Sequence, residues 1–560
     1  MSNDLIRETA KRIAGRAALA AAAAFSKGAA AALLITLIVA DAAGAKAPGA
    51  APRPNLRGGE TAETLDDASA LAPHGTPRPT RRPVRAAGAT RALTFTASGA
   101  ARIIEGALPR NPVSGEAGYA LIDIATGRVL ERRKAEQGFV PASVSKAPTA
   151  LYALDTLGPD FVFRTRVYAV GSIENGVLHG DLYLSGSGDP VLDTAELARL
   201  AQAVADKGIR KVDGVLLYDA SALPLAEQIE PTQPVHAAYN PSVSGLNLNF
   251  NRVLLKWERQ NGRNYEIGLF AHSSRKVIEA TTVNAALLPD GVTTNRVLRY
   301  TRDASLAERW DVSRKILTRR GSRWLPVQRP ARYVAATFRA LLEEAGVETP
   351  DEMLPDVTPH GAMLIAEHQS MPLKRILRGM LKFSTNLTAE VVGMEASRKL
   401  GLGALSFERS GAEMTRFMLA RYGLEPSTTR FANHSGLASK SRVSPLDMAR
   451  LMATVAATDA QYEAMSWLLP RYRVRKLTGA TIRAKTGTMY FARGLSGLIE
   501  CDRGRRMAFA YFNSDIARRD ELDRSVDPTS TEKPRGGSRW LKRAQVIERE
   551  LLAEWVKKRC

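Results

Sequence analysis

The chain has 560 residues, 45% hydrophobic and 24% charged, a composition typical of a folded globular protein that is too long for one compact core. Its formal net charge of +22 predicts attraction to a polyanion. Because the sequence has no zinc-knuckle spacing and no RNA-binding aromatic signature, we expect no nucleic-acid partner. An anionic membrane surface or an acidic wall polymer is the favoured partner. The only two cysteines, Cys501 and Cys560, exclude a cysteine metal site; we expect two unpaired thiols, although an oxidising compartment would allow one disulfide.

Residues 1–45 predict an export signal. A basic region precedes the apolar run Gly28–Ala40, and small residues with A-x-A sites ending at Ala42 or Ala45 follow it. The run is shorter than the ~18 residues typical of a membrane span, but Ala17–Phe25 would lengthen it into an uncleaved anchor. We therefore expect a periplasmic protein, either released by cleavage or held at the inner membrane.

Residues 46–100 are rich in Pro, Ala, Gly and Arg and lack hydrophobic periodicity, which predicts a disordered linker. Folding signals begin near residue 100. The stretch GYALIDIATGRVLERR predicts a hairpin around Thr126-Gly127, and the helix that carries Ser143 follows. Residues 160–360 read mostly as short strands with turns, and two helical patches, 194–207 and 330–346, interrupt them.

Helices are predicted to dominate residues 374–424 and 444–468, before a return to strands in TIRAKTGTMY, GLSGLIECD and RRMAFAYFNS. A final amphipathic helix is expected from about 539 to 558, with Ser538 placed to cap it and with packing against the sheet as its function. Its apolar face would consist of Trp540, Ala544, Ile547, Leu551 and Trp555. This order of elements favours one core domain split by an insertion.

One short motif raises a chemical hypothesis. The stretch GFVPASVSKAPTALYALDTLG places Lys146 one helical turn after Ser143, where its amine can reach the hydroxyl. A desolvated lysine has a lowered pKa and can act as the base for a serine nucleophile. Ser-x-x-Lys is a weak pattern by itself, since it also occurs at Ser273 and Ser530, but neither of those serines opens an apolar helical run.

Two further motifs strengthen this hypothesis. KFSTNLTAE contains the only Ser-x-Asn of the chain, at 384–386, and RAKTGTMYF contains the only Lys-Thr-Gly, at 485–487. The second motif falls on a predicted strand, where a glycine allows a peptide or acyl substrate to lie close against the backbone. In the order Ser-x-x-Lys, Ser-x-Asn and Lys-Thr-Gly, the motifs resemble those of the penicillin-recognising serine enzymes: penicillin-binding proteins, DD-peptidases and serine β-lactamases.

The spacing narrows this resemblance. Ser143 and Ser384 are 384 − 143 = 241 residues apart, far more than in the compact β-lactamases. An insertion of this size is similar to that of the low-molecular-mass class C penicillin-binding proteins, the D-alanyl-D-alanine carboxypeptidase/endopeptidase family. The resemblance to this family extends to other segments, such as NGVLHGDLYLSGSGDPVL, YNPSVSGLNLNFN and SGLASKSRVSP. It therefore covers roughly residues 115–515.

The resemblance implies an α+β fold: a β-lactamase/DD-peptidase-like catalytic domain, with an antiparallel sheet flanked by helices and a helical subdomain, split by a long, mostly β insertion. We expect the catalytic domain at 101–164 and 366–560 and the insertion at 165–365. The implied site residues are catalytic Ser143, Lys146, Ser384 and Asn386, and substrate-binding Lys485, Thr486, Gly487 and Thr488.

The implied activity is a serine DD-carboxypeptidase/endopeptidase that cleaves D-Ala-D-Ala and D-alanyl cross-links of peptidoglycan through an acyl-enzyme. Its partners would be peptidoglycan stem peptides and, as covalent inhibitors, β-lactam antibiotics; no metal or organic cofactor is required. A β-lactamase or esterase on the same scaffold is one alternative, but the chain offers no evident glutamate for fast deacylation. A non-catalytic cell-wall or penicillin-binding protein is another, against which the intact motifs argue.

The motifs of other hydrolase classes are missing from the sequence, and one segment differs from the usual pattern of the family. The chain has no His-Glu-x-x-His and no Gly-x-Ser-x-Gly, which disfavours a zinc peptidase of that type and an α/β-hydrolase. SGSGDP at 185–190 is expected to be a turn rather than a phosphate loop. The family usually has Asp-Gly ahead of Ser-Gly-Leu, where this chain has Asn433-His434, and we expect His434 to be a polar residue at the rim of the cleft.

Overall fold

The computed structural model describes residues 113–262, 264–289, 297–302, 307–403 and 405–560. The predicted export signal or anchor, residues 1–45, and the predicted linker, residues 46–100, lie outside these residues. In the part of the chain that the structure describes, no helix combines the length and the apolar character needed to cross a membrane.

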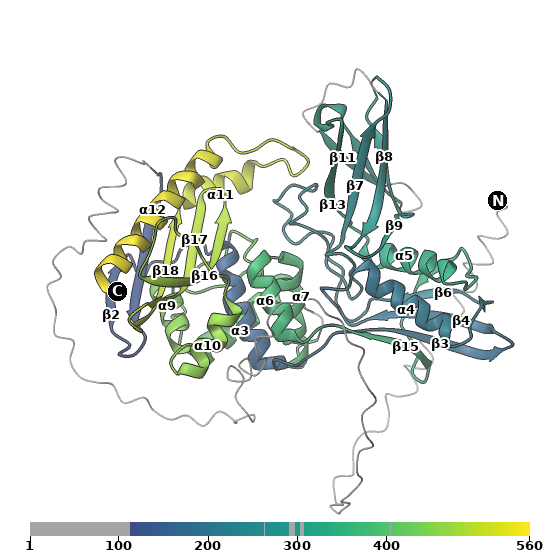
Figure 1. Ribbon diagram of the computed structural model, residues 1–560, viewed down its shortest axis with the longest axis horizontal. Coiled ribbons are helices and arrows are strands. Elements are labelled where there is room, and N and C mark those ends of the chain that lie inside the picture. Colours follow the sequence, from purple (N-terminus) through teal and green to yellow (C-terminus); the bar gives the residue numbers. More distant parts are fainter. Residues whose placement is uncertain (1–112, 263, 290–296, 303–306, 404) are drawn as a thin grey trace, which may run out of the picture. The chain divides into compact units, whose positions relative to one another are not determined.

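The beginning and the end of the described chain share one antiparallel sheet (Figure 1). Its strand order is β16-β17-β18-β1-β2, so that the strand with the Lys-Thr-Gly motif, β16, stands at an edge. The predicted hairpin around Thr126-Gly127 is confirmed as β1 and β2. The strands are β1 (Glu116–Asp123), β2 (Val129–Arg133), β16 (Ala480–Met489), β17 (Ala492–Cys501) and β18 (Arg506–Ser514).

The long C-terminal helix α12 (Gly537–Arg559) packs against one face of this sheet (Figure 1). The predicted apolar face is confirmed, because Trp540, Ala544, Ile547, Leu551 and Trp555 are all buried in the cluster that α12 forms with β17 and β18. The predicted cap is wrong. The helix begins earlier, and Gly536, at the left-handed φ of 76°, precedes it in place of Ser538.

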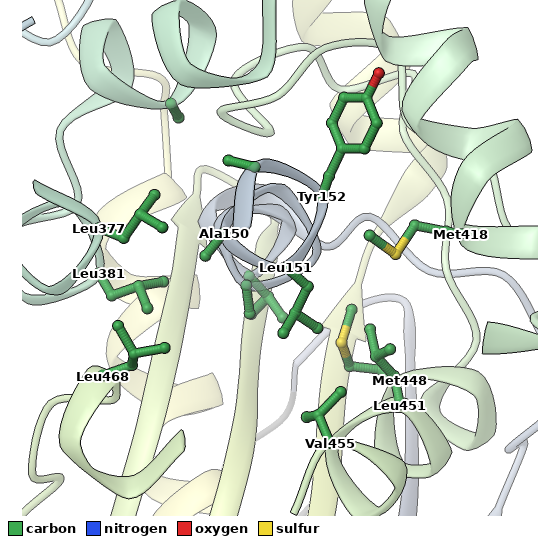
Figure 2. Packing of buried hydrophobic residues seen from close by; sticks show 14 of the residues in the cluster. Ala150, Leu151, Tyr152, Leu377, Leu381, Met418, Met448, Leu451, Val455 and Leu468 are labelled. Atoms are coloured by element: carbon green, nitrogen blue, oxygen red, sulfur yellow. The ribbon is translucent and has the colours of Figure 1, made fainter. Parts of the chain in front are cut away.

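A bundle of helices covers the other face, and its centre is α3 (Lys146–Leu157). In Figure 2, which shows part of the hydrophobic cluster around α3, Ala150 of α3 lies on the side of Leu377 and Leu151 on the side of Met448, whereas the ring of Tyr152 points away from both groups. The helices predicted for 374–424 and 444–468 are confirmed, and each contributes buried residues to this cluster. They are α6 (Leu373–Phe383), α7 (Asn386–Lys399), α8 (Phe407–Tyr422), α9 (Pro445–Thr454) and α10 (Asp459–Leu468).

Between α3 and α6 the chain is rich in strands, as predicted, and has a hydrophobic cluster of its own. One sheet has the order β14-β6-β4-β3-β15, with β5 beside β4; a second has the order β13-β7-β8-β9, and a third β10-β12-β11. The two predicted helical patches are confirmed as α4 (Thr194–Asp206) and α5 (Pro330–Glu344). The SGSGDP segment runs from the end of β4 into a loop, as expected.

The strands of the first of these sheets are β3 (Arg164–Glu174), β4 (Val177–Gly186), β5 (Lys211–Val212), β6 (Leu216–Asp219), β14 (Met353–Pro355) and β15 (Met363–Gln369). The others are β7 (Arg252–Arg259), β8 (Tyr265–His272), β9 (Val277–Glu279), β10 (Val283–Leu287), β11 (Leu298–Arg302), β12 (Glu308–Val312) and β13 (Arg320–Pro326), with the short 3-10 helix η3 (Arg314–Ile316).

Two features at the C-terminal end differ from the expectations. A helix that was not predicted, α11 (Ile516–Ser525), follows β18. The expectation of two unpaired thiols is wrong, because Cys501 and Cys560 form a disulfide with their Cα atoms 5.1 Å apart. The reason is tertiary: α12 runs back along the sheet and brings Cys560, the residue after its end, to Cys501 at the end of β17, a proximity that a separation of 59 residues does not reveal.

Candidate active site

Ser143 lies in the short 3-10 helix η2 (Ala142–Ser145), which leads directly into α3. The sequence predicted that Ser143 opens the α-helix, whereas the α-helix itself begins at Lys146 and the serine occupies the tighter turn before it. Ala142 has a φ of 46°, in the left-handed region that residues other than glycine seldom adopt. Such backbone strain beside a functional side chain is typical of active sites.

Lys146 is buried, and its ammonium contacts three oxygen atoms. The Nζ atom lies 3.0 Å from Ser143 Oγ, 2.6 Å from Asn386 Oδ1 and 2.7 Å from the carbonyl oxygen of Ser435. The three contacts come from η2, from the start of α7 and from the loop that precedes α9. Because three separate segments fix its end, this lysine has little freedom to turn away from Ser143.

Burial lowers the pKa of both lysines of the site. The pKa of Lys146 falls well below its usual value because its ammonium is desolvated and lies near Lys485, while Glu390 partly offsets the shift. The pKa of Lys485 falls to about 7, first because of burial and then because of the positive charge of Arg493. These shifts favour a neutral amine on Lys146, the form that can accept a proton from a hydroxyl.

The second motif forms the junction between two helices. Ser384 ends α6 with a left-handed φ of 58°, and Asn386 is the first residue of α7. The third motif meets it there: Lys485 Nζ lies 2.9 Å from Ser384 Oγ. The three motifs are therefore in one place, with Asn386 in contact with Lys146 and Ser384 in contact with Lys485.

Lys485–Thr488 all lie on the edge strand β16. Lys485 is buried, Thr486 is half-buried and Thr488 is exposed. The missing side chain of Gly487 has a structural role in addition to the predicted role in substrate approach. A Cβ atom at Gly487 would lie 2.3 Å from the carbonyl oxygen of Pro141, so the absence of a side chain lets β16 pack against the segment that carries Ser143.

Glu390 is a buried site residue that motif analysis did not find. Its two carboxylate oxygens accept hydrogen bonds from the backbone N–H groups of His434, at 3.1 Å, and Ser435, at 2.9 Å. These bonds hold the turn whose Ser435 carbonyl contacts Lys146. One signal was available in the sequence: Glu390 follows Asn386 by four residues, which places both on one face of a helix.

The expectation of a rim position for His434 is wrong. Its side chain is fully buried, stacks on Tyr152 and lies with Nε2 2.7 Å from Ser410 Oγ. Burial lowers the pKa of His434 to about 3, so the imidazole is neutral at physiological pH. The side chain packs in the space left by Gly393, where a Cβ atom would lie 2.2 Å from the ring.

A mixed α and β fold with a serine hydroxyl beside a buried, desolvated lysine is the framework of a serine-type hydrolase, and the comparisons with known proteins make this one a peptidase. The chain belongs to the D-Ala-D-Ala carboxypeptidase 3 (S13) family, whose model matches residues 101–529.

Relatives of known identity agree with this assignment. The chain is 22% identical over 423 residues to the D-alanyl-D-alanine carboxypeptidase DacB of Haemophilus influenzae, an alignment that covers 72% of this chain and 86% of that protein. It is 26% identical over 439 residues to the D-alanyl-D-alanine carboxypeptidase of an Actinomadura strain, R39, covering 71% of this chain and 77% of the relative.

The fold is similar to that of a solved structure. The crystal structure of penicillin binding protein 4 from Haemophilus influenzae superposes with a TM-score of 0.64 at 22% identity, covering 80% of this chain and 98% of the other. The same protein in complex with a β-lactam gives a TM-score of 0.63. The expected β-lactamase/DD-peptidase-like α+β fold is thereby confirmed.

Proposed function

We propose that this protein is a serine D-Ala-D-Ala carboxypeptidase that acts on peptidoglycan stem peptides through an acyl-enzyme. One observation carries the proposal: the buried amine of Lys146 lies 3.0 Å from the hydroxyl of Ser143 and is held there by Asn386. Membership of a D-Ala-D-Ala carboxypeptidase family supports the choice of substrate.

In this mechanism the Ser143 hydroxyl attacks the carbonyl between the two terminal D-alanines while neutral Lys146 takes its proton. An ester forms on Ser143 as the peptide bond breaks, and the departing D-alanine amine takes up a proton through Ser384. Water then hydrolyses the ester and regenerates the hydroxyl. Asn386 keeps Lys146 in place and contacts the amide of the substrate.

The remaining residues bind the substrate. The ammonium of Lys485 attracts the terminal carboxylate, and the hydroxyls of Thr486 and Thr488 bond that carboxylate and the peptide backbone. The backbone N–H groups of Ser143 and Thr488 stabilise the oxyanion of the tetrahedral intermediate. Gly487 serves this arrangement indirectly, because it allows the strand to lie against η2.

Three finer properties belong to the same proposal. The enzyme also cuts D-alanyl cross-links, since these contain the same acyl group on the penultimate residue. Penicillin acylates Ser143 covalently. The protein works in the periplasm, where stem peptides are exposed, after export directed by the segment before residue 46.

The test combines penicillin labelling with turnover of a D-Ala-D-Ala peptide. Ser143→Ala is expected to abolish both the covalent adduct, measured by mass spectrometry, and the release of D-alanine, while the melting temperature stays close to that of the wild type. Ser273→Ala is the matched control, because Ser273 belongs to a second Ser-x-x-Lys whose lysine ammonium pairs with Glu344 instead.

The outcomes separate the alternatives. An adduct that persists in Ser143→Ala would remove the proposed nucleophile. Rapid loss of the adduct in the wild type, with penicillin turnover and no D-alanine release, would indicate a β-lactamase. A stable adduct without any peptide turnover would indicate a penicillin-binding protein without peptidase activity.

A further inference from the structure

A buried ion pair lies directly behind the exposed end of the substrate-binding strand. Arg493 of β17 is paired in register with Thr488 of β16, and its side chain is only 5% exposed. Its Nε and Nη2 atoms each lie 2.7 Å from a different carboxylate oxygen of Glu548, a fully buried residue of α12. The third nitrogen, Nη1, lies 2.6 Å from Thr488 Oγ1.

The chemistry of these groups decides the direction of the hydrogen bond. A guanidinium group carries five N–H donors and no acceptor, so Arg493 donates and the Thr488 oxygen accepts. The single proton of the threonine hydroxyl must then point elsewhere. Among the described residues it meets no acceptor, and because Thr488 is exposed, the proton is available to a ligand that lies along β16.

Anchoring α12 to the sheet is an insufficient explanation for this ion pair. Burying two charges costs desolvation free energy, and an apolar pair of similar volume is often equally stable or more stable. Other contacts already hold the helix, including its apolar face, the disulfide of Cys560 and the ion pair of Arg559 with Glu131. The Arg493–Glu548 pair differs from these in reaching Thr488.

We propose that Arg493, fixed by Glu548, is a positioning residue that turns the hydroxyl proton of Thr488 toward the terminal carboxylate of the substrate. The network thereby makes the enzyme selective for peptides with a free C-terminal carboxylate. This inference rests on the proposed function.

The experiment compares kcat/KM for a D-Ala-D-Ala peptide with a free carboxylate and for the same peptide amidated at its C-terminus. The paired variant Arg493→Met/Glu548→Leu leaves no buried charge unpaired. In this variant kcat/KM for the peptide acid is expected to fall roughly tenfold to a hundredfold, and kcat/KM for the amide less than about twofold. Thr488→Val is expected to lower kcat/KM for the peptide acid by a similar factor, whereas Thr488→Ser is expected to retain most of the activity.

A double-mutant cycle tests whether Arg493 acts through Thr488. Adding Thr488→Val to the paired variant is expected to cause no further fall in kcat/KM for the peptide acid, since both changes remove the same interaction. Independent, multiplying losses would overturn the proposal, as would equal losses on acid and amide. Should the paired variant fail to fold, Arg493→Lys keeps the charge but lacks the fork that reaches Glu548 and Thr488 together, and it is expected to lose the same selectivity.

The matched control is the other ion pair between α12 and the sheet. Arg559→Met/Glu131→Leu loosens the helix without contacting β16, so the acid-to-amide ratio is expected to stay as in the wild type. A ratio that falls in this control would show that loosening α12 is sufficient and would overturn the proposal.

Failure of the proposed function has a different signature. A wild type that releases no D-alanine from any peptide but is acylated by penicillin defeats the proposed activity alone. The same variants are then compared by acylation with a penicillin and with its carboxyl methyl ester, where loss of the preference for the free acid is expected. A wild type inert in both assays would overturn both proposals.

Discussion

The carboxylate of Glu390 accepts a hydrogen bond from the backbone N–H of Ser435 at 2.9 Å, and the carbonyl of Ser435 in turn accepts one from Lys146 at 2.7 Å. Burial raises the pKa of Glu390, and the two N–H donors on its oxygens partly offset this shift. When Glu390 is ionised, its negative charge raises the pKa of Lys146 against the effect of burial. Glu390 therefore influences the proposed base twice, through geometry and through charge.

Replacing Glu390 by Gln is expected to shift the pH dependence of acylation. Without the negative charge the pKa of Lys146 falls further, so more neutral amine is present at low pH and the acid limb of the penicillin acylation rate moves to lower pH. The maximal rate is expected to fall, because one of the two N–H groups then faces an amide NH2. An acid limb that stays in place or moves to higher pH would contradict the electrostatic part of this account.

Lys485 is expected to give carboxylate-bearing substrates an alkaline limit. Its pKa is lowered to about 7 in the free protein, so above this pH the ammonium that attracts the carboxylate is progressively lost. KM for an acid-terminated peptide is therefore expected to rise as the pH increases through about 7, and KM for the amide to change little. Lys485→Met should remove the difference and cost roughly 1.5–3 kcal/mol on the acid, measured as kcat/KM. Parallel pH profiles for acid and amide would contradict this role.

The sequence allowed the three motifs to be predicted because each combines a residue type with a local spacing, and local spacing is what helix and strand geometry preserve. It also indicated most of the strands, most of the helices and the apolar face of α12, but not α11. The contacts of Glu390 with the turn at Ser435, and of Arg493 with Glu548, join residues 45 and 55 positions apart through tertiary packing, which no local pattern encodes. The disulfide of Cys501 and the burial of His434 escaped prediction for the same reason.

Gly487→Ala tests whether the glycine is needed for packing under Ser143. The added Cβ would lie 2.3 Å from the Pro141 carbonyl oxygen, a backbone atom that cannot turn aside, so β16 and η2 must separate. We expect a loss of about 1–3 kcal/mol in unfolding free energy and a slower penicillin acylation. Gly379→Ala is the control: it lies in α6 with no atom within 4 Å of the new Cβ, and is expected to be neutral or stabilising. Slower acylation with an unchanged unfolding free energy would instead favour close substrate approach as the role of the glycine, and normal acylation would contradict both explanations.

The proposed division of the chain into a catalytic domain, at 101–164 and 366–560, and an insertion at 165–365 leads to the last prediction. The strand-rich segment has its own hydrophobic cluster, in which Trp310 is fully buried, whereas Met448 belongs to the cluster around α3 (Figure 2). If the insertion is a separate folding unit, Trp310→Ala should lower its stability by roughly 3–5 kcal/mol and expose it to early proteolysis, yet leave penicillin labelling of Ser143 in place at moderate temperature. Met448→Ala should have the reverse effect, weakening labelling while the insertion still resists the protease.

The two variants are compared by heating each protein, measuring penicillin labelling, and identifying the proteolytic fragments by mass spectrometry. Simultaneous loss of labelling and of protease resistance in both variants would mean that the two parts unfold as one cooperative unit and that the proposed boundaries do not separate domains.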